Sequence, residues 1–83
     1  MDKNFELFSI KFAEILDIDK EELHDNFKLD SSIFDSLAIL SMSALVIELF
    51  EVELNKEKVA KCKNFSSLLK VIKNEIISKN ADN

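Results

Sequence analysis

The chain has 83 residues, 47% of them hydrophobic and 33% charged, with a formal net charge of -5 and a single cysteine. A chain this short buries only about 60% of its unfolded surface, which argues against an enclosed active site and favours one small module that is not an enzyme. The negative charge argues against a nucleic-acid-binding protein that relies on phosphate neutralisation. One cysteine excludes an internal disulfide and a cysteine-cluster metal site.

The chain carries no pattern typical of secretion or of a membrane span. Its start, Met1-Asp2-Lys3 followed by an amphipathic pattern, is unlike a signal peptide. The densest apolar stretch, residues 37–50, is interrupted by two serines and one glutamate and is shorter than the about 20 residues that cross a bilayer. We therefore expect a cytoplasmic protein.

The first half of the chain predicts one helix and a long connection. No glycine or proline occurs, so helix ends must be read from Asn, Asp and Ser. Apolar residues three and four apart predict an amphipathic helix over residues 4–16, capped by Asn4. This helical spacing of apolar residues is absent from residues 17–35, where we expect a long connection with one helical turn near residues 20–24. We expect this connection to be ordered, because its spaced apolar residues can pack over the helix ends.

The second half of the chain predicts three more helical segments. Residues 36–50 form the second main helix, capped by Asp35 or Ser36. A short segment spans residues 56–61, and the last helix spans residues 65–77 with Asn64 as its cap. No alternating run indicates a sheet. The predicted fold is all-α, a small four-helix bundle of three main helices and one short helix with a long first loop. Residues 1–78 form the domain and residues 79–83 a disordered tail.

The tripeptide Asp35-Ser36-Leu37 places a hydroxyl at the start of an apolar helix. The free N–H groups and the positive end of the helix dipole there suit a phosphodiester on the Ser36 side chain. The alternative is that Asp35 and Ser36 are an ordinary capping pair, since both residue types are preferred N-caps.

In this context the chain resembles the acyl carrier protein family over about residues 5–77. The Asp-Ser-Leu motif follows Phe34 and opens the second of three main helices after a long loop. Phe50-Glu51-Val52-Glu53-Leu54 resembles the family's Phe-Gly-Ile-Glu-Ile, and Asn64-Phe65 stands in the place of its Thr-Val helix start. A short motif gains weight from such matching surroundings.

The resemblance implies a cofactor and a set of partners. Ser36 would carry 4′-phosphopantetheine taken from coenzyme A, with Asp35 and Leu37 as the flanking motif residues. The chain would be a stand-alone, monomeric acyl carrier protein that holds acyl groups as thioesters for fatty acid or polyketide biosynthesis. Its partners would be a phosphopantetheinyl transferase, a loading enzyme and a downstream acyltransferase or synthase.

One departure from the family concerns the second helix. Family members of fatty-acid synthesis usually bear several carboxylates there, whereas Glu48 is the one carboxylate between Ser36 and Phe50. A specialised pathway is therefore expected rather than bulk lipid synthesis. An aminoacyl or peptidyl carrier stays open as an alternative within the carrier class, and an unmodified helical adaptor stays open outside it.

The second helix carries two apolar stripes, and a bundle can bury only one of them fully. The stripe predicted to face inward contains Ile39, Met42, Ser43, Val46 and Phe50. The other begins beside Ser36 and is predicted, together with Glu48, to be a partner-binding surface, with extra core under the loop as the alternative. That stripe consists of Leu37, Leu40, Ala44 and Ile47.

Several other side chains have two readings. Asp35 either caps the helix or pairs with a basic residue of the transferase. The lysines at 56, 58, 61 and 63 are either a solvated face or a surface that selects an acidic partner.

No metal site or reactive thiol is predicted. His24 lies among carboxylates, but a lone histidine is weak evidence for a metal site. Cys62 is expected to be a small apolar filler.

Overall fold

The computed structural model describes residues 3–81, without the side chain of Ala81. Within these residues the helices are α1 (Lys3–Leu16), α2 (Ser36–Phe50), α3 (Lys56–Ala60) and α4 (Phe65–Ala81), and a 3-10 turn, η1 (Lys20–Glu22), interrupts the first connection. No strand forms in this part of the chain. The predicted all-α bundle of three main helices and one short helix, with a long first loop, is confirmed.

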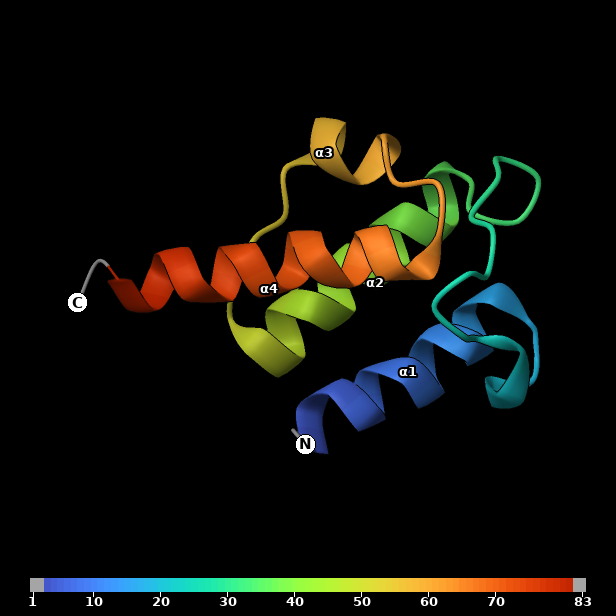
Figure 1. The fold of residues 1–83 in the computed structure, drawn as a ribbon, viewed down its shortest axis with the longest axis horizontal. Helices are drawn as coiled ribbons and strands as arrows, with labels where there is room; N and C mark the ends of the chain where they lie inside the picture. Colours follow the sequence, from blue (N-terminus) through green and yellow to red (C-terminus); the bar gives the residue numbers. More distant parts are fainter. Residues whose placement is uncertain (1–2, 82–83) are drawn as a thin grey trace.

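The helices are arranged so that α3 and α1 lie on opposite sides of the molecule. Figure 1 shows α4 along the length of the bundle, with α2 crossing behind it, α1 below and α3 above. The first connection covers the end at which α2 begins. The start of α2 therefore lies beside the first connection, and the short helix α3 is presented on the side away from α1.

Phenylalanine side chains from separate elements meet at the centre of the core. Phe12 of α1 stacks on Phe65 of α4 with ring centroids 5.9 Å apart. It also meets Phe34 edge-on at 5.7 Å and Phe8 at 5.4 Å. Such aromatic pairs add about 0.5–1.5 kcal/mol each to the energy of area burial. Phe12 thus joins α1, the first connection and α4.

The first connection is ordered, as predicted, because it buries apolar side chains and pairs its backbone with α4. Leu23, Leu29 and Phe34 belong to the core. The N–H of Leu29 donates to the carbonyl of Lys63 at 3.0 Å, and the N–H of Phe65 donates to the carbonyl of Phe27 at 2.9 Å. These bonds fix the loop against the start of α4.

Two helices end on left-handed residues although the chain has no glycine. Asp17 (φ 60°) follows α1, and the N–H of Ile18 donates to the carbonyl of Ala13 at 3.0 Å, which is a Schellman motif. Glu51 (φ 58°) ends α2. Its carbonyl accepts a hydrogen bond from Nζ of Lys79 in α4 at 2.8 Å, so α4 contributes to the end of α2.

Three predicted helix boundaries differ from the structure. Asn4 is not a cap, because α1 begins at Lys3; instead its Nδ2 donates to the carbonyl of Leu49 at 3.1 Å. The helix α3 ends at Ala60 rather than residue 61. The helix α4 continues to Ala81, so the predicted tail of residues 79–83 overlaps it, and residues 82–83 lie outside the described chain.

The inward face of α2 also differs from the predicted stripe. Met42 and Val46 are buried as predicted, but the other three predicted residues, Ile39, Ser43 and Phe50, are only half-buried. Their places are taken by Ala38 and Leu45. The buried face is therefore rotated by about one residue from the predicted face. Nearly every position of α2 is apolar, so its hydrophobic periodicity gives little information about which face is buried.

Candidate functional site

The start of α2 is organised by Asp35 and not by Ser36. Asp35 has extended backbone angles, and its Oδ1 accepts the N–H of Ala38 at 2.9 Å, the geometry of a helix N-cap. Ser36 is the first residue of the helix and is exposed. Because the capping role belongs to the carboxylate, the Ser36 hydroxyl is available to another molecule.

A tight turn in the loop positions this helix start. The N–H groups of Ile33 and Phe34 donate to the carbonyl of Asp30 at 3.1 and 2.8 Å. The Asp30 carboxylate accepts hydrogen bonds from the hydroxyl and the N–H of Ser32, and these bonds hold its pKa below the usual value. The turn leads into the buried ring of Phe34, which anchors the residue before the cap.

The local field at Ser36 favours a negatively charged group. The first N–H groups of a helix have no partner within the helix, and the helix dipole adds roughly half a positive charge at this end. An anion attached to the first residue therefore meets donors without desolvating a buried charge. The exposed Ser36 hydroxyl fits a phosphodiester bond.

Hollows between α2 and α3 run away from Ser36 along α2. The first has a volume of about 270 Å³ and is lined by Ser36, Ile39, Leu40, Ser43, Lys56 and Ala60. The second, of about 250 Å³, shares three of these residues and adds Ala44, Ile47, Glu53 and Leu54. We call the two together the α2–α3 groove. Its lining is mainly apolar, with Lys56 in both parts.

A third hollow, of about 320 Å³, opens on the loop side of the same serine. Its lining includes Asp35, Ser36, Phe34 and Cys62. Cys62 is buried, its Sγ lies 3.4 Å from the carbonyl of Lys58, and burial raises the pKa of its thiol. A raised thiol pKa keeps the side chain protonated, which fits a packing residue better than a nucleophile.

The predicted partner-binding stripe points to solvent. Leu37 is 71% exposed, Leu40 60% and Ile47 47%. Ala44 and Glu48 are exposed as well. The structure therefore brings these five side chains together on the outer face of the helix that begins with Ser36.

Other candidate sites contribute no cluster. His24 is exposed in the first connection. Within residues 3–81 no three His, Cys, Asp or Glu side chains gather in a way that could hold a metal ion. None of the helices described is both long and apolar enough to cross a membrane.

Two features of the site were not predicted. Lys56 lines the groove beside Ser36, and Asp30 builds the turn before the motif. Asp30-Ser31-Ser32 is a typical turn sequence and could have indicated the second feature. No sequence signal could have indicated the first, because it depends on how α3 sits against α2.

Comparison with known families settles the class of protein. The family model for the phosphopantetheine attachment site matches residues 10–72, more than half of the chain. The chain belongs to this family. It is a carrier protein with a covalently attached 4′-phosphopantetheine, and carrier domains of this family are not catalytic. A search of curated proteins and one of solved structures each give no match.

The geometry at the start of α2 fits this carrier family. The exposed hydroxyl, the capped helix N-terminus and the adjoining groove all lie within residues 10–72. When bound, the cofactor supplies a thiol on a flexible arm, on which cargo is held as a thioester. The phosphopantetheinyl transferase and synthase enzymes that act on carrier domains are its general class of partner.

Proposed function

We propose that Ser36 is the attachment residue and that the protein carries acyl groups as thioesters on the attached arm. One observation supports this most directly: Ser36 is an exposed hydroxyl at the first position of α2, and Asp35 takes the capping role beside it. The matched family requires such a hydroxyl, and its match spans this position.

The attachment needs little from the carrier itself. Ser36 Oγ attacks the β-phosphate of coenzyme A, forming one P–O bond as the bond to the bridging oxygen breaks and the nucleotide leaves. The hydroxyl proton passes to a base of the transferase. The carrier contributes an accessible nucleophile and the N-terminal field of α2, which stabilises the phosphodiester produced.

The groove favours acyl over aminoacyl cargo. Its walls include Ile39, Leu40 and Leu54, which suit a hydrocarbon chain. Lys56 lines both parts of the groove, and its charge would repel the α-ammonium group of an aminoacyl thioester. Glu53, which would attract that group, lines only the part farther from Ser36. The scarcity of carboxylates on α2 supports service in a specialised pathway.

The outer face of α2 is the proposed docking surface for partner enzymes. Leu37, Leu40, Ala44, Ile47 and Glu48 are all exposed and extend from Ser36 along the helix. Exposed apolar patches of this kind mark interaction sites in small soluble proteins. Its position lets an enzyme that binds α2 also reach the arm.

An intact-mass experiment tests the attachment residue. The purified chain is incubated with coenzyme A and a broad-specificity phosphopantetheinyl transferase, and one phosphopantetheine should be added. Ser36→Ala should abolish the addition, whereas Ser41→Ala, which removes another exposed hydroxyl of α2, should leave it intact. An unchanged mass of the wild-type protein would support the unmodified adaptor instead.

A further inference from the structure

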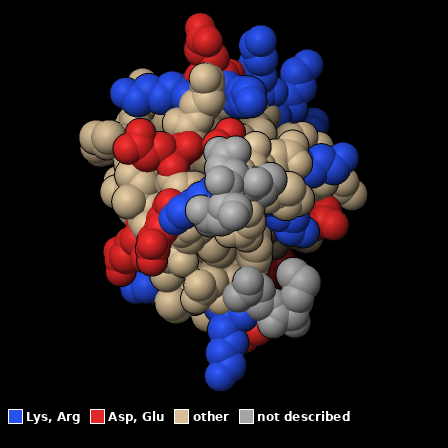
Figure 2. Space-filling model, turned by 90° about the vertical axis from the view of Figure 1, so that its left-hand side faces the viewer, with Lys and Arg blue, Asp and Glu red and all other residues tan. Residues whose placement is uncertain are grey.

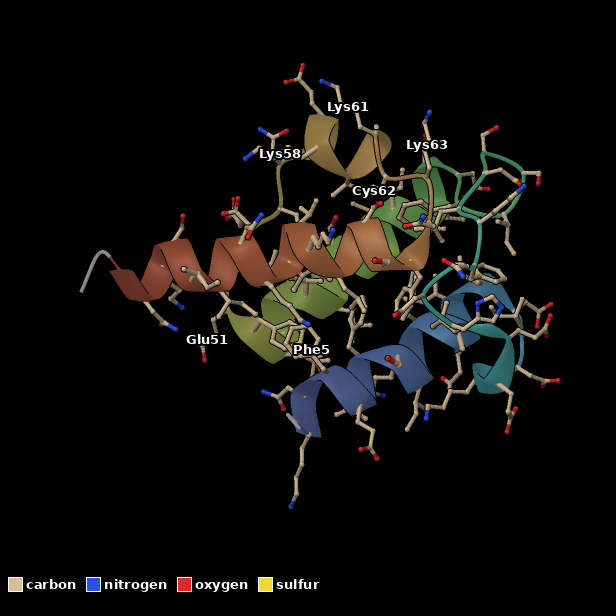
Figure 3. All side chains as sticks on the ribbon, in the orientation of Figure 1. Phe5, Glu51, Lys58, Lys61, Cys62 and Lys63 are labelled. Atoms are coloured by element: carbon tan, nitrogen blue, oxygen red, sulfur yellow. The ribbon has the colours of Figure 1, made fainter. Side chains whose placement is uncertain are left out.

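The lysines around α3 form a positive patch on an acidic protein. Residues 56–63 contain four lysines and one glutamate, a local net charge of +3 in a chain whose net charge is -5. All four lysines are exposed. Figure 3 shows Lys58, Lys61 and Lys63 projecting outward from α3 and the segment that follows it, while Figure 2 shows several basic side chains along the same upper edge.

The patch is not neutralised within the molecule. None of the four ammonium groups forms an ion pair or hydrogen bond with the residues described. The carboxylates concentrate elsewhere: residues 17–35 contain seven Asp and Glu against two lysines. The positive charge on the α3 side is therefore available to an external partner.

The patch adjoins the apolar stripe of α2. Lys56 lines both parts of the α2–α3 groove together with the exposed Leu40, and the farther part also contains Ile47. The remaining lysines follow within seven residues of Lys56. Lys56 thus joins the apolar stripe, which begins beside Ser36, to the segment that bears the other three lysines.

We propose that this surface docks a partner protein that presents apolar side chains flanked by carboxylates. The inference concerns the partner of the carrier site and so rests on the proposed function. The apolar contacts with Leu40 and Ile47 supply most of the binding energy. The charges of Lys56, Lys58, Lys61 and Lys63 steer the approach and select the partner.

An acidic protein fits better than another polyanion. Asp35 and Glu48 are exposed toward the two ends of the apolar stripe, so a uniformly anionic membrane or nucleic acid would face them too. A protein can place its carboxylates opposite the lysines alone. The overall charge of -5 also disfavours nucleic acid, whose binding depends on phosphate neutralisation.

The test uses two designed amphipathic helical peptides that share one leucine face. One carries glutamate on its polar face, and its twin carries lysine at the same positions. Binding to the full chain is measured by NMR titration. The acidic peptide should bind and shift the amide signals of Leu40, Ile47 and Lys56, with affinity falling as salt is added. The basic twin should bind at least tenfold more weakly.

Two triple variants localise the effect. K58E/K61E/K63E should weaken binding of the acidic peptide by about tenfold. K3E/K11E/K20E makes the same change in net charge on α1 and η1, away from α3, and should change the affinity less than twofold. All of these lysines are exposed, and circular dichroism checks that both variants keep their helices.

Several outcomes would overturn the proposal. Equal binding of the two peptides would remove the charge preference, and equal weakening by the two triple variants would remove the role of the patch. The surface would be assigned to a membrane if the protein sedimented with phosphatidylglycerol vesicles, lost this binding in K58E/K61E/K63E, and did not bind the acidic peptide. Arm transfer is followed separately by intact mass, so its failure is distinguishable from failure of docking.

Discussion

Asp35 and Ser36 divide two roles at the start of α2: either residue type can cap the helix, but Ser36 alone of the two offers a hydroxyl. A Ser in the N-cap position would use its own oxygen to accept a helix N–H. In this protein Asp35 Oδ1 accepts the N–H of Ala38, and Ser36 stands one position later with its side chain exposed. The separation of cap and hydroxyl is what makes Ser36 a candidate for modification.

Removing the Asp35 cap should cost stability without removing the hydroxyl. Asp35→Ala should lower the free energy of unfolding by about 1 kcal/mol, because the N–H of Ala38 loses its acceptor. Asp35→Asn, which keeps an accepting oxygen, should stay within about 0.5 kcal/mol of the wild type. Urea unfolding measures both variants. Equal losses in the two would show that the charge, and not the cap, stabilises the helix.

Asp30 should contribute to the pH dependence of stability. Its pKa is lowered in the folded state, first by the Ser32 hydroxyl. A lowered folded-state pKa gives stability that is present above the unfolded-state value of about 4 and is lost as the pH falls through the folded-state value. Stability measured below pH 4 should therefore fall less steeply in Asp30→Asn than in the wild type. Ser32→Ala should also flatten the slope; identical slopes in all three proteins would contradict this account.

At the scale of elements, the sequence predicted the bounds of α2 but not the direction in which it faces. Asp35 marks the start of the helix, and the apolar run ends at Phe50, so both ends were predicted correctly. The buried face was wrong in part because the helix is apolar nearly all round. Tertiary packing against α1 and the first connection, which a single sequence does not contain, decides the rotation.

Substitutions on the two faces of α2 should differ in how much they change the free energy of unfolding. Leu40→Glu changes a side chain that is 60% exposed and should alter the free energy of unfolding by less than about 0.5 kcal/mol. Met42→Ala removes a fully buried side chain and should cost about 2–5 kcal/mol. Thermal unfolding followed by circular dichroism distinguishes them. A large loss of helicity in Leu40→Glu would place Leu40 in the core.

The end of α4 illustrates a second limit of the sequence. Neither glycine nor proline marks its end, and the polar residues after Ile77 predict a tail. In the structure Lys79 reaches the carbonyl and the carboxylate of Glu51, at 2.8 and 3.7 Å. This long-range tie between α4 and the end of α2 has no local sequence signal.

At the scale of the whole molecule, the arrangement of charge is as informative as its total. The sum of -5 argues only against a nucleic-acid partner, whereas the chain separates an acidic first connection from a basic α3. The α3 side adjoins Ser36 through the α2–α3 groove. The positions of the lysines were visible in the sequence, whereas their contact with the groove required the three-dimensional packing.

The shared phenylalanine core makes the bundle one cooperative unit. Phe12 is fully buried and contacts aromatic rings from α1, the first connection and α4. Phe12→Ala should cost about 3–5 kcal/mol, a large part of the stability of so small a domain. Hydrogen exchange should accelerate together in α1, α4 and the loop. Acceleration confined to α1 would contradict a single cooperative core.

The most direct test of the central claim is the tandem mass spectrum of the protein isolated from its native host. We expect one 4′-phosphopantetheine on Ser36, with part of the population carrying an acyl group that hydroxylamine releases from the thiol. An aminoacyl group would retain the site but change the cargo. A protein without the arm, or with the arm on another residue, would contradict the assignment of Ser36.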